Sequence, residues 1–210
     1  AARNAYYYRV NRADHNNEPG LYYTHVYAYD NLGNYHIVTE QEKINVPGVV
    51  TYDYSTNGGK SATKTRAVVN YNAAIDLTPT ATKDNWIFVG WNTDKNATTG
   101  LTSLNMGTSD VTLYAIYSKK LTVNFVDYNG TQKRTTSYNT TIYNNTQSAE
   151  FTPPANGTYT GWSWVGWVRN STSNTAAIEN VNSNGKYTVY ATSPDVTFYG
   201  KYTKNVTAYY

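Results

Sequence analysis

Cysteine is absent from the 210 residues, and its absence limits the chemistry open to this chain. Without thiols the chain has no disulfide, no thiolate metal ligand and no cysteine nucleophile. Charged residues are also scarce, at 15% against roughly 25% in an average domain. The formal net charge is +3, and no run of Lys and Arg occurs. The electrostatic footprint of a nucleic-acid binder is therefore missing, and we expect no nucleic-acid partner.

Long apolar runs are missing as well. No stretch approaches the ~20 residues that a membrane-crossing helix needs, so the sequence predicts no membrane span in this segment. The chain starts with Ala1-Ala2-Arg3 rather than a secretory signal, and residues 205–210 resemble the start of a further strand. We expect a segment of a longer protein whose targeting signals lie elsewhere.

Tyrosine is the abundant large side chain, with 23 Tyr against 4 Phe and 1 Met. Its ring is apolar and its hydroxyl is polar, which suits strands that are half exposed. Asn and Thr stand where helices would favour Ala, Leu, Glu and Lys. The composition predicts a mainly β protein.

An internal repeat organises most of the chain. The motif Trp86-Ile-Phe-Val-Gly-Trp91 recurs as Trp162-Ser-Trp-Val-Gly-Trp167. Each copy lies between an earlier strand of alternating residues and a later strand that begins with Asp-Val-Thr. Offsets between landmarks grow from 71 residues (Thr51 to Thr122) to 85 residues (Asp110 to Asp195), so the second copy contains insertions. The predicted strands are 49–55, 65–71, 86–92 and 111–117 in the first copy, and 121–128, 135–143, 162–169, 186–191 and 196–202 in the second.

The repeat resembles the Listeria–Bacteroides repeat, the B-repeat of internalins. The first copy carries the resemblance in Asn57-Gly58-Gly59, Trp86, Phe88, Gly90-Trp91, Asp110 and the strand 111–115. The second copy departs from the pattern at Thr131, Trp164 and Gly200. The resemblance implies two tandem small β-grasp-like modules of a kind found on Gram-positive surface proteins.

Residues 1–45 fall outside the repeat. Strands are expected at 5–10, 21–29 and 35–39, with a turn at 30–34 and a linker at 40–48. Asp14-His15, Gly20 with Tyr22, the stretch 25–30 and Gly33-Asn34 resemble the second half of a streptococcal Bsp-type Ig-like repeat. That family occurs in secreted surface proteins and cell-wall hydrolases.

The resulting domain prediction has four parts: 1–45, a partial Ig-like β segment and linker; 46–119, the first β-grasp-like repeat; 120–204, the second; and 205–210, the start of a further strand. The two-residue junction Lys119-Lys120 leaves little room for independent motion and favours a stiff rod.

The candidate site residues belong to the two copies of the Trp motif, 86–91 and 162–167. Strict alternation along a strand places Trp86 with Phe88, and Trp162 with Trp164, on one face of the sheet. We interpret that face as the core, with a ligand-stacking platform as the alternative. Trp91 and Trp167 fall on the other face, so they are weak candidates for contact with a partner, with packing as the alternative.

Catalytic and metal-binding patterns are missing. The sequence has no zinc-protease helix, nucleophile elbow or phosphate-cradling loop. His15, His25 and His36 lack a compact ligand spacing, and residues 30–34 have the composition of a turn. We therefore predict no catalytic residue, no metal ligand and no cofactor.

Two function hypotheses remain open. The first is a non-catalytic structural or adhesive segment, a stalk or interaction module, of a large bacterial protein that is secreted or attached to the cell wall. Its partner would be a host or cell-surface protein or a glycan. The alternative is an accessory carbohydrate-binding or cell-wall-binding region of a secreted hydrolase. Unpaired strand edges near both ends further predict self-association.

Overall fold

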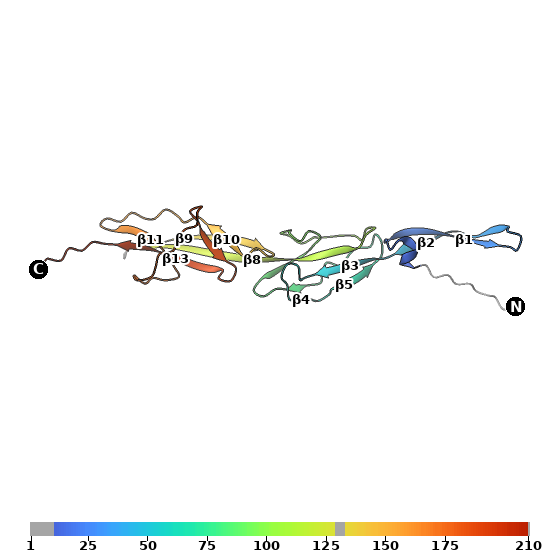
Figure 1. Ribbon diagram of the computed structural model, residues 1–210, viewed down its shortest axis with the longest axis horizontal. Helices are drawn as coiled ribbons and strands as arrows, with labels where there is room; N and C mark the ends of the chain where they lie inside the picture. Colours follow the sequence, from blue (N-terminus) through green and yellow to red (C-terminus); the bar gives the residue numbers. More distant parts are fainter. Residues whose placement is uncertain (1–10, 129–132, 210) are drawn as a thin grey trace. The chain divides into compact units, whose positions relative to one another are not determined.

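The computed structural model describes residues 11–128 and 133–209, and the chain is mainly β, with 48% of its residues in strands. This confirms the predicted fold class. Two compact units form, Ala1–Tyr117 and Ser118–Tyr210 (Figure 1). Within the described ranges, no helix is long and apolar enough to cross a membrane.

The described residues of the first unit form one 3₁₀ turn and a series of mostly short strands. Its elements are η1 (Arg12–His15), β1 (Gly20–Tyr29), β2 (Tyr35–Val46), β3 (Gly48–Asp53), β4 (Ser61–Ala62), β5 (Arg66–Val69), β6 (Ala81–Thr82), β7 (Ile87–Asn92) and the first part of β8 (Val111–Tyr128).

The strands β1 and β2 form an antiparallel hairpin that runs from the pair Gly20 and Val46 to the pair Tyr29 and Tyr35. Asp30 closes the turn, because its carboxylate accepts hydrogen bonds from the backbone of Leu32 and Asn34 at 2.8 and 2.9 Å. The predicted turn is confirmed. The predicted linker at 40–48 is wrong, because the backbone of β2 stays paired with β1 as far as Val46. The strand predicted at 5–10 lies outside the described residues.

The base of the hairpin is tied to the repeat that follows it. Asp110, one of the repeat landmarks, accepts hydrogen bonds from the guanidinium of Arg12 at 2.5 Å and from the backbone N–H of Val49 at 2.9 Å. A Cβ at Gly48 would lie 2.9 Å from Cγ of Pro19 and closer still to the sulfur of Met106. Glycine therefore lets the chain pass between the two segments.

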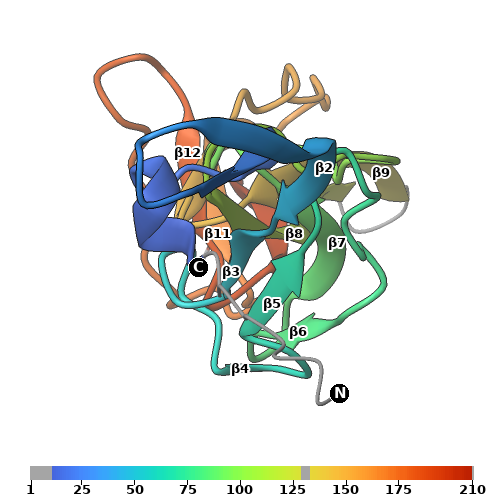
Figure 2. The same ribbon diagram turned by 90° about the vertical axis from the view of Figure 1, so that its right-hand side faces the viewer.

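A mixed sheet forms the body of the first unit. β5 pairs antiparallel with β3, β3 pairs parallel with the start of β8, and β7 pairs with the other edge of β8. Figure 2 shows β3 and β5 side by side, with the small β4–β6 pair below them. All four strands predicted for the first copy are present, whereas the two-residue strands β4 and β6 were too short for periodicity to indicate.

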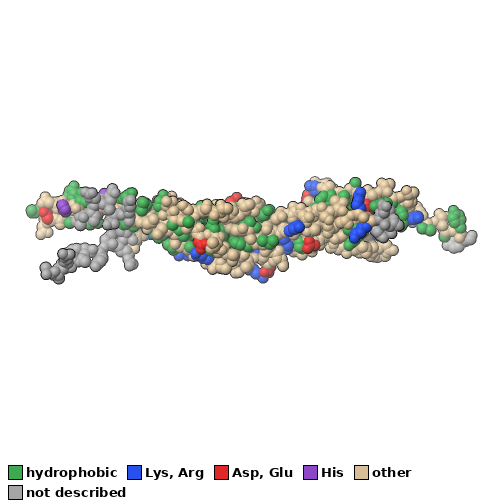
Figure 3. Space-filling view, turned by 180° about the vertical axis from the view of Figure 1, so that it is seen from behind, with side chains coloured by type: hydrophobic (Ala, Val, Ile, Leu, Met, Phe, Trp, Pro, Cys, Tyr) green, Lys and Arg blue, Asp and Glu red, His purple; other side chains and the backbone are tan. Residues whose placement is uncertain are grey.

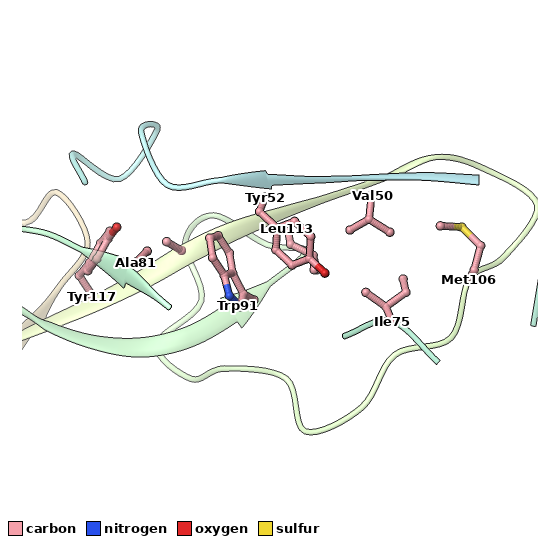
Figure 4. Packing of buried hydrophobic residues seen from close by; sticks show 9 residues of the cluster. Val50, Tyr52, Ile75, Ala81, Trp91, Met106, Leu113 and Tyr117 are labelled. Atoms are coloured by element: carbon pink, nitrogen blue, oxygen red, sulfur yellow. The ribbon is translucent and has the colours of Figure 1, made fainter. Parts of the chain in front are cut away.

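The core of the first unit lies on one side of this sheet (Figure 4). Tyr52 and Trp91 meet edge to face, with ring centroids 5.2 Å apart, and the Tyr52 hydroxyl donates to the carbonyl of Asp76 at 2.6 Å. The other fully or nearly fully buried members are Val50, Ile75, Ala81, Met106, Leu113, Ala115 and Tyr117. Tyrosine can serve in this core because a backbone carbonyl receives its hydroxyl.

The second unit repeats this strand order. Its elements are the remainder of β8, then β9 (Lys133–Tyr143), β10 (Ser148–Phe151), β11 (Ser163–Arg169), β12 (Tyr187–Tyr190) and β13 (Asp195–Thr203). β9 pairs antiparallel with β8, β8 pairs parallel with β13, and β13 pairs antiparallel with β11. The order is that of β5, β3, β8 and β7 in the first unit. β10 and β12 form a separate pair.

β8 is continuous from Val111 to Tyr128 and serves both units. Its first residues pair with β3, and Ser118–Tyr128 pair with β9. The two lysines predicted as a junction lie within this strand: Lys119 pairs with Ile142 and Lys120 pairs with Thr141. The division between the units falls after Tyr117, close to the predicted boundary after Lys119. A pair of lysines interrupts the hydrophobic pattern, but long side chains are compatible with an extended backbone.

The strand registers also correct the alignment of the two copies. Val50 lies opposite Val111, and Val123 lies opposite Val196. The opening strands therefore correspond with an offset of 73 residues, Val50 to Val123, instead of the 71 suggested by Thr51 and Thr122. A shift of two residues preserves the inward and outward alternation, so the hydrophobic pattern alone does not distinguish the two alignments.

The burial of Tyr117 predicts how stability changes at alkaline pH. Burial raises the pKa of Tyr117 to about 12, whereas a tyrosine in the unfolded chain titrates near ~10. The contribution to stability is fully present below pH ~10 and is lost as pH rises toward 12, because only the unfolded chain then releases the proton. Urea denaturation should show a smaller loss of stability between these pH values for Tyr117→Phe than for the unchanged protein. Equal losses would contradict the assignment.

Candidate functional site

The last tryptophan of each copy of the Trp motif is buried. Trp91 is 1% exposed and Trp167 is 4% exposed. The indole N–H of Trp91 donates to the carbonyl of Pro79 at 2.6 Å. Their predicted position on the face opposite Phe88 and Trp164 is wrong, since the ring centroids lie 5.5 Å apart for Phe88 and Trp91 and 5.0 Å apart for Trp164 and Trp167.

A bulge at the glycine before Trp167 explains the error in the second unit, and the corresponding glycine of the first unit has a similar backbone conformation. The register of β11 against β13 shifts between Trp164 and Gly166, and an extra residue in one strand reverses the alternation beyond it. Gly90, the counterpart of Gly166, has a φ of 148°. A Cβ at Gly90 would lie 3.0 Å from the Cα of Gly100, so a side chain is excluded by the neighbouring backbone as well as by the conformation.

The loops that follow these strands fold back over the tryptophans. The N–H of Leu101 donates to the carbonyl of Trp91 at 2.8 Å, and the N–H of Glu179 donates to the carbonyl of Trp167 at 2.8 Å. In the second unit a two-pronged ion pair also fixes this loop, because both carboxylate oxygens of Glu179 lie 2.5 Å from the guanidinium of Arg169. Trp91 and Trp167 are therefore core residues, and their rings leave almost no surface for contact with a partner.

The first tryptophan of the Trp motif has different surroundings in the two copies. Trp86 is partly buried against the first core, and the Lys83 ammonium lies 4.0 Å from its ring centroid. Trp162 is 40% exposed, and Lys204 lies 5.8 Å from its ring. The core interpretation thus holds in part for Trp86 and is wrong for Trp162, which is the exposed tryptophan that the alternation pattern placed inside.

Trp162 borders a surface cavity of about 210 Å³ in the second unit. The lining combines aromatic rings, hydroxyl groups, an amide and an ammonium group, and its residues are Trp162, Val168, Ser171, Thr172, Ser173, Asn174, Tyr199, Gly200, Lys201 and Tyr202. We call this cavity the Trp162 groove. No member of the lining is a carboxylate.

Asp127 is a buried carboxylate at the end of the same unit, with its side chain 3% exposed. It accepts hydrogen bonds from the Tyr202 hydroxyl at 2.7 Å and from the N–H of Gly157 at 2.7 Å, and Arg134 lies 3.9 Å away. Burial and the adjacent Asp127 raise the pKa of Tyr202 and of Tyr159. The sequence signal was a charged residue at an inward position of an alternating strand, after Val123 and Phe125, and our sequence interpretation missed it.

The three histidines, His15, His25 and His36, belong to no cluster of metal ligands among the described residues. Within the described part of the chain, no three His, Asp or Glu side chains are placed to hold a metal ion. His15 stacks on Tyr22, with ring centroids 4.0 Å apart, and His25 stacks near Tyr27 at 6.4 Å. Figure 3 shows hydrophobic and histidine side chains at the surface of the hairpin, where Tyr23, Tyr27, Tyr29 and Tyr35 are exposed.

The comparison with known families identifies part of the first unit. Residues 49–116, from β3 to the first part of β8, match the Listeria-Bacteroides repeat domain. Domains of this family are typically extracellular structural repeats of surface proteins. No curated protein and no solved structure matches the chain.

Removal of the Trp91 ring should be far more damaging than removal of an exposed side chain in the same strand. We expect Trp91→Ala to reduce the free energy of unfolding by about 3–5 kcal/mol, because a fully buried ring and its packing are lost. Ile87→Ala is the control, since Ile87 is 67% exposed and should change stability by less than about 0.5 kcal/mol. Urea denaturation of both variants measures the difference, and similar values would refute the core assignment.

Substitution of Asp127 tests the hydrogen-bond cluster in the second unit. Asp127→Leu removes the acceptor of the Gly157 N–H and leaves the Tyr202 hydroxyl only the carbonyl of Gly157, at 3.2 Å, so we expect a loss of about 1–3 kcal/mol. Asp195→Leu replaces an exposed aspartate of the same unit and serves as the control. Thermal unfolding followed by tyrosine and tryptophan fluorescence would show whether only the first variant melts early.

Proposed function

We propose that the chain is a non-catalytic structural and interaction segment of a large bacterial surface protein, secreted or attached to the cell wall, built from two tandem β-grasp-like modules. The observation that carries this proposal is the shared strand order of the two units, together with the family match of the first. A module whose aromatic side chains are mostly used in its core is suited to a scaffold role.

Equivalent ring contacts support the second unit as a divergent copy. Tyr52 meets Trp91 at 5.2 Å and 76°, and Phe125 meets Trp167 at 5.0 Å and 73°. Each pair joins the opening strand to the Trp strand of its unit. The same ring geometry, at positions related by the corrected register, is what divergence from one module predicts.

Two departures of the second copy compensate for each other. Trp164 stands where the first copy has Phe88, and Gly200 stands where it has the buried Ala115. A Cβ at Gly200 would lie 3.0 Å from the Trp164 ring and 3.2 Å from Oδ1 of Asp127. The loss of a methyl group therefore makes room for a larger ring, as expected when a core is repacked at nearly constant volume.

The continuous strand β8 supports a scaffold role for the pair. Because β8 closes the first sheet and opens the second, no linker loop separates the two modules in sequence. Force applied along this strand would act on ladder hydrogen bonds in both units. We infer that the pair serves as a stalk or spacer.

We propose that the hairpin at the start belongs to an Ig-like domain of Bsp type, whose second half its sequence resembles. Among the described residues, β1 and β2 pair only with each other, so each has an unpaired outer edge. A two-stranded ribbon is marginally stable in water and gains by pairing. Self-association through these edges remains a prediction.

Surface labelling tests the proposed location. Antibodies raised against the purified chain should label intact, unpermeabilised cells of the producing bacterium, because the proposed segment lies outside the membrane. Mild protease treatment of intact cells should remove the signal, while a cytoplasmic marker protein stays intact. Labelling that requires cell lysis would refute the proposal.

A further inference from the structure

We propose that the Trp162 groove binds an acidic saccharide, with a sugar ring stacked on the Trp162 indole and the sugar carboxylate facing the ammonium of Lys204. This inference adds a ligand class to the interaction role proposed above. Its failure would leave the structural role of the two modules in place, because that role rests on the shared strand order and the ring contacts of the cores and requires no ligand.

The first argument is the difference between Trp162 and its counterpart. Trp86 is packed against its core under Lys83, whereas Trp162 keeps 40% of its surface in water. Trp162 follows a tight turn, in which Gly161 has a φ of 78° and the N–H of Trp162 donates to the carbonyl of Tyr159 at 3.0 Å. An exposed indole with one polar neighbour is suited to the apolar C–H face of a pyranose ring.

The second argument is that the wall of the groove is already formed. The loop 170–176 is tied to β13 at both of its ends. Asn170 exchanges two hydrogen bonds with the backbone of Thr197, at 2.7 and 2.8 Å, and the Lys201 ammonium donates to the carbonyl of Ala176 at 2.8 Å. Between these ties, residues 171–174 line the groove with three hydroxyl groups and one amide, which can bind sugar hydroxyls without prior ordering of the loop.

The third argument is the sign of the charge. Basic side chains lie on the surface of the second unit (Figure 3), and three of its four acidic residues face a basic partner. The pairs are Asp127 with Arg134, Glu150 with Lys186, and Glu179 with Arg169. Lys201 lines the groove, Lys204 lies 5.8 Å from the ring centroid of Trp162, and no carboxylate contributes to the lining. The local field therefore favours an anionic ligand over a neutral one.

Isothermal titration of the full chain with tetragalacturonic acid, and with cellotetraose as the neutral probe, tests the proposal. We expect saturable binding of the acidic probe, weaker binding of the neutral probe, and a preference that declines as salt is added. Trp162→Ala should weaken binding of the acidic probe by about tenfold or more, as for a central aromatic contact. Lys204→Gln should weaken binding of the acidic probe and leave binding of the neutral probe unchanged.

Matched controls separate the groove from general surface effects. Tyr190→Ala removes another exposed ring of the same unit, which is 55% exposed, and Lys120→Gln removes an exposed lysine outside the groove. Neither should change binding, and circular dichroism should show all four variants folded. Absence of saturable binding to the acidic probe, binding unaffected by Trp162→Ala in a folded variant, or equal binding of both probes at low salt would overturn the proposal.

Discussion

The edge-to-face contact between an opening-strand ring and the Trp of the third strand holds each module together. Tyr52 with Trp91, and Phe125 with Trp167, join strands that lie on opposite sides of the closing strand in their sheets. A module of this size has few large apolar groups, so one ring pair supplies a large share of its buried surface. The glycine bulge, the loop that caps the Trp carbonyl and the tyrosine hydroxyl that donates to Asp76 all serve to bring that pair inside.

The parallel pairing of opening and closing strands explains how β8 can belong to two modules. In each unit the opening strand pairs antiparallel on one edge and parallel on the other. The closing strand of the first copy continues in sequence through Lys119 and Lys120 as the opening strand of the second copy. Tandem duplication of such a module therefore needs no linker, and each further copy could add to the preceding one in the same way.

The sequence predicted the strands of the two repeats well, because a half-buried strand carries its alternation in a few adjacent residues. It failed where the outcome depended on one residue or on a distant neighbour. Gly166 shifts the register, and this places Trp167 on the same face as Trp164, opposite to its predicted face. Residues 40–46 looked like a linker because their pairing partner is β1, which local periodicity does not reveal. The Asp127 cluster also depends on tertiary structure, since Tyr202 and Gly157 reach it from other segments.

Several side chains in which the second copy differs from the first contact one another, and this clustering is informative. Gly200 accommodates both Trp164 and Asp127, and Asp127 in turn receives the hydroxyl of Tyr202, which lines the Trp162 groove. The same region of the first copy has Ala115, Phe88 and a Trp86 ring held against its core under Lys83. Because the core rings keep their geometry in both units, folding alone does not require this rebuilding. The changed residues instead support the rim of a groove and leave one tryptophan in water, which is the pattern expected when one copy of a scaffold acquires a binding surface.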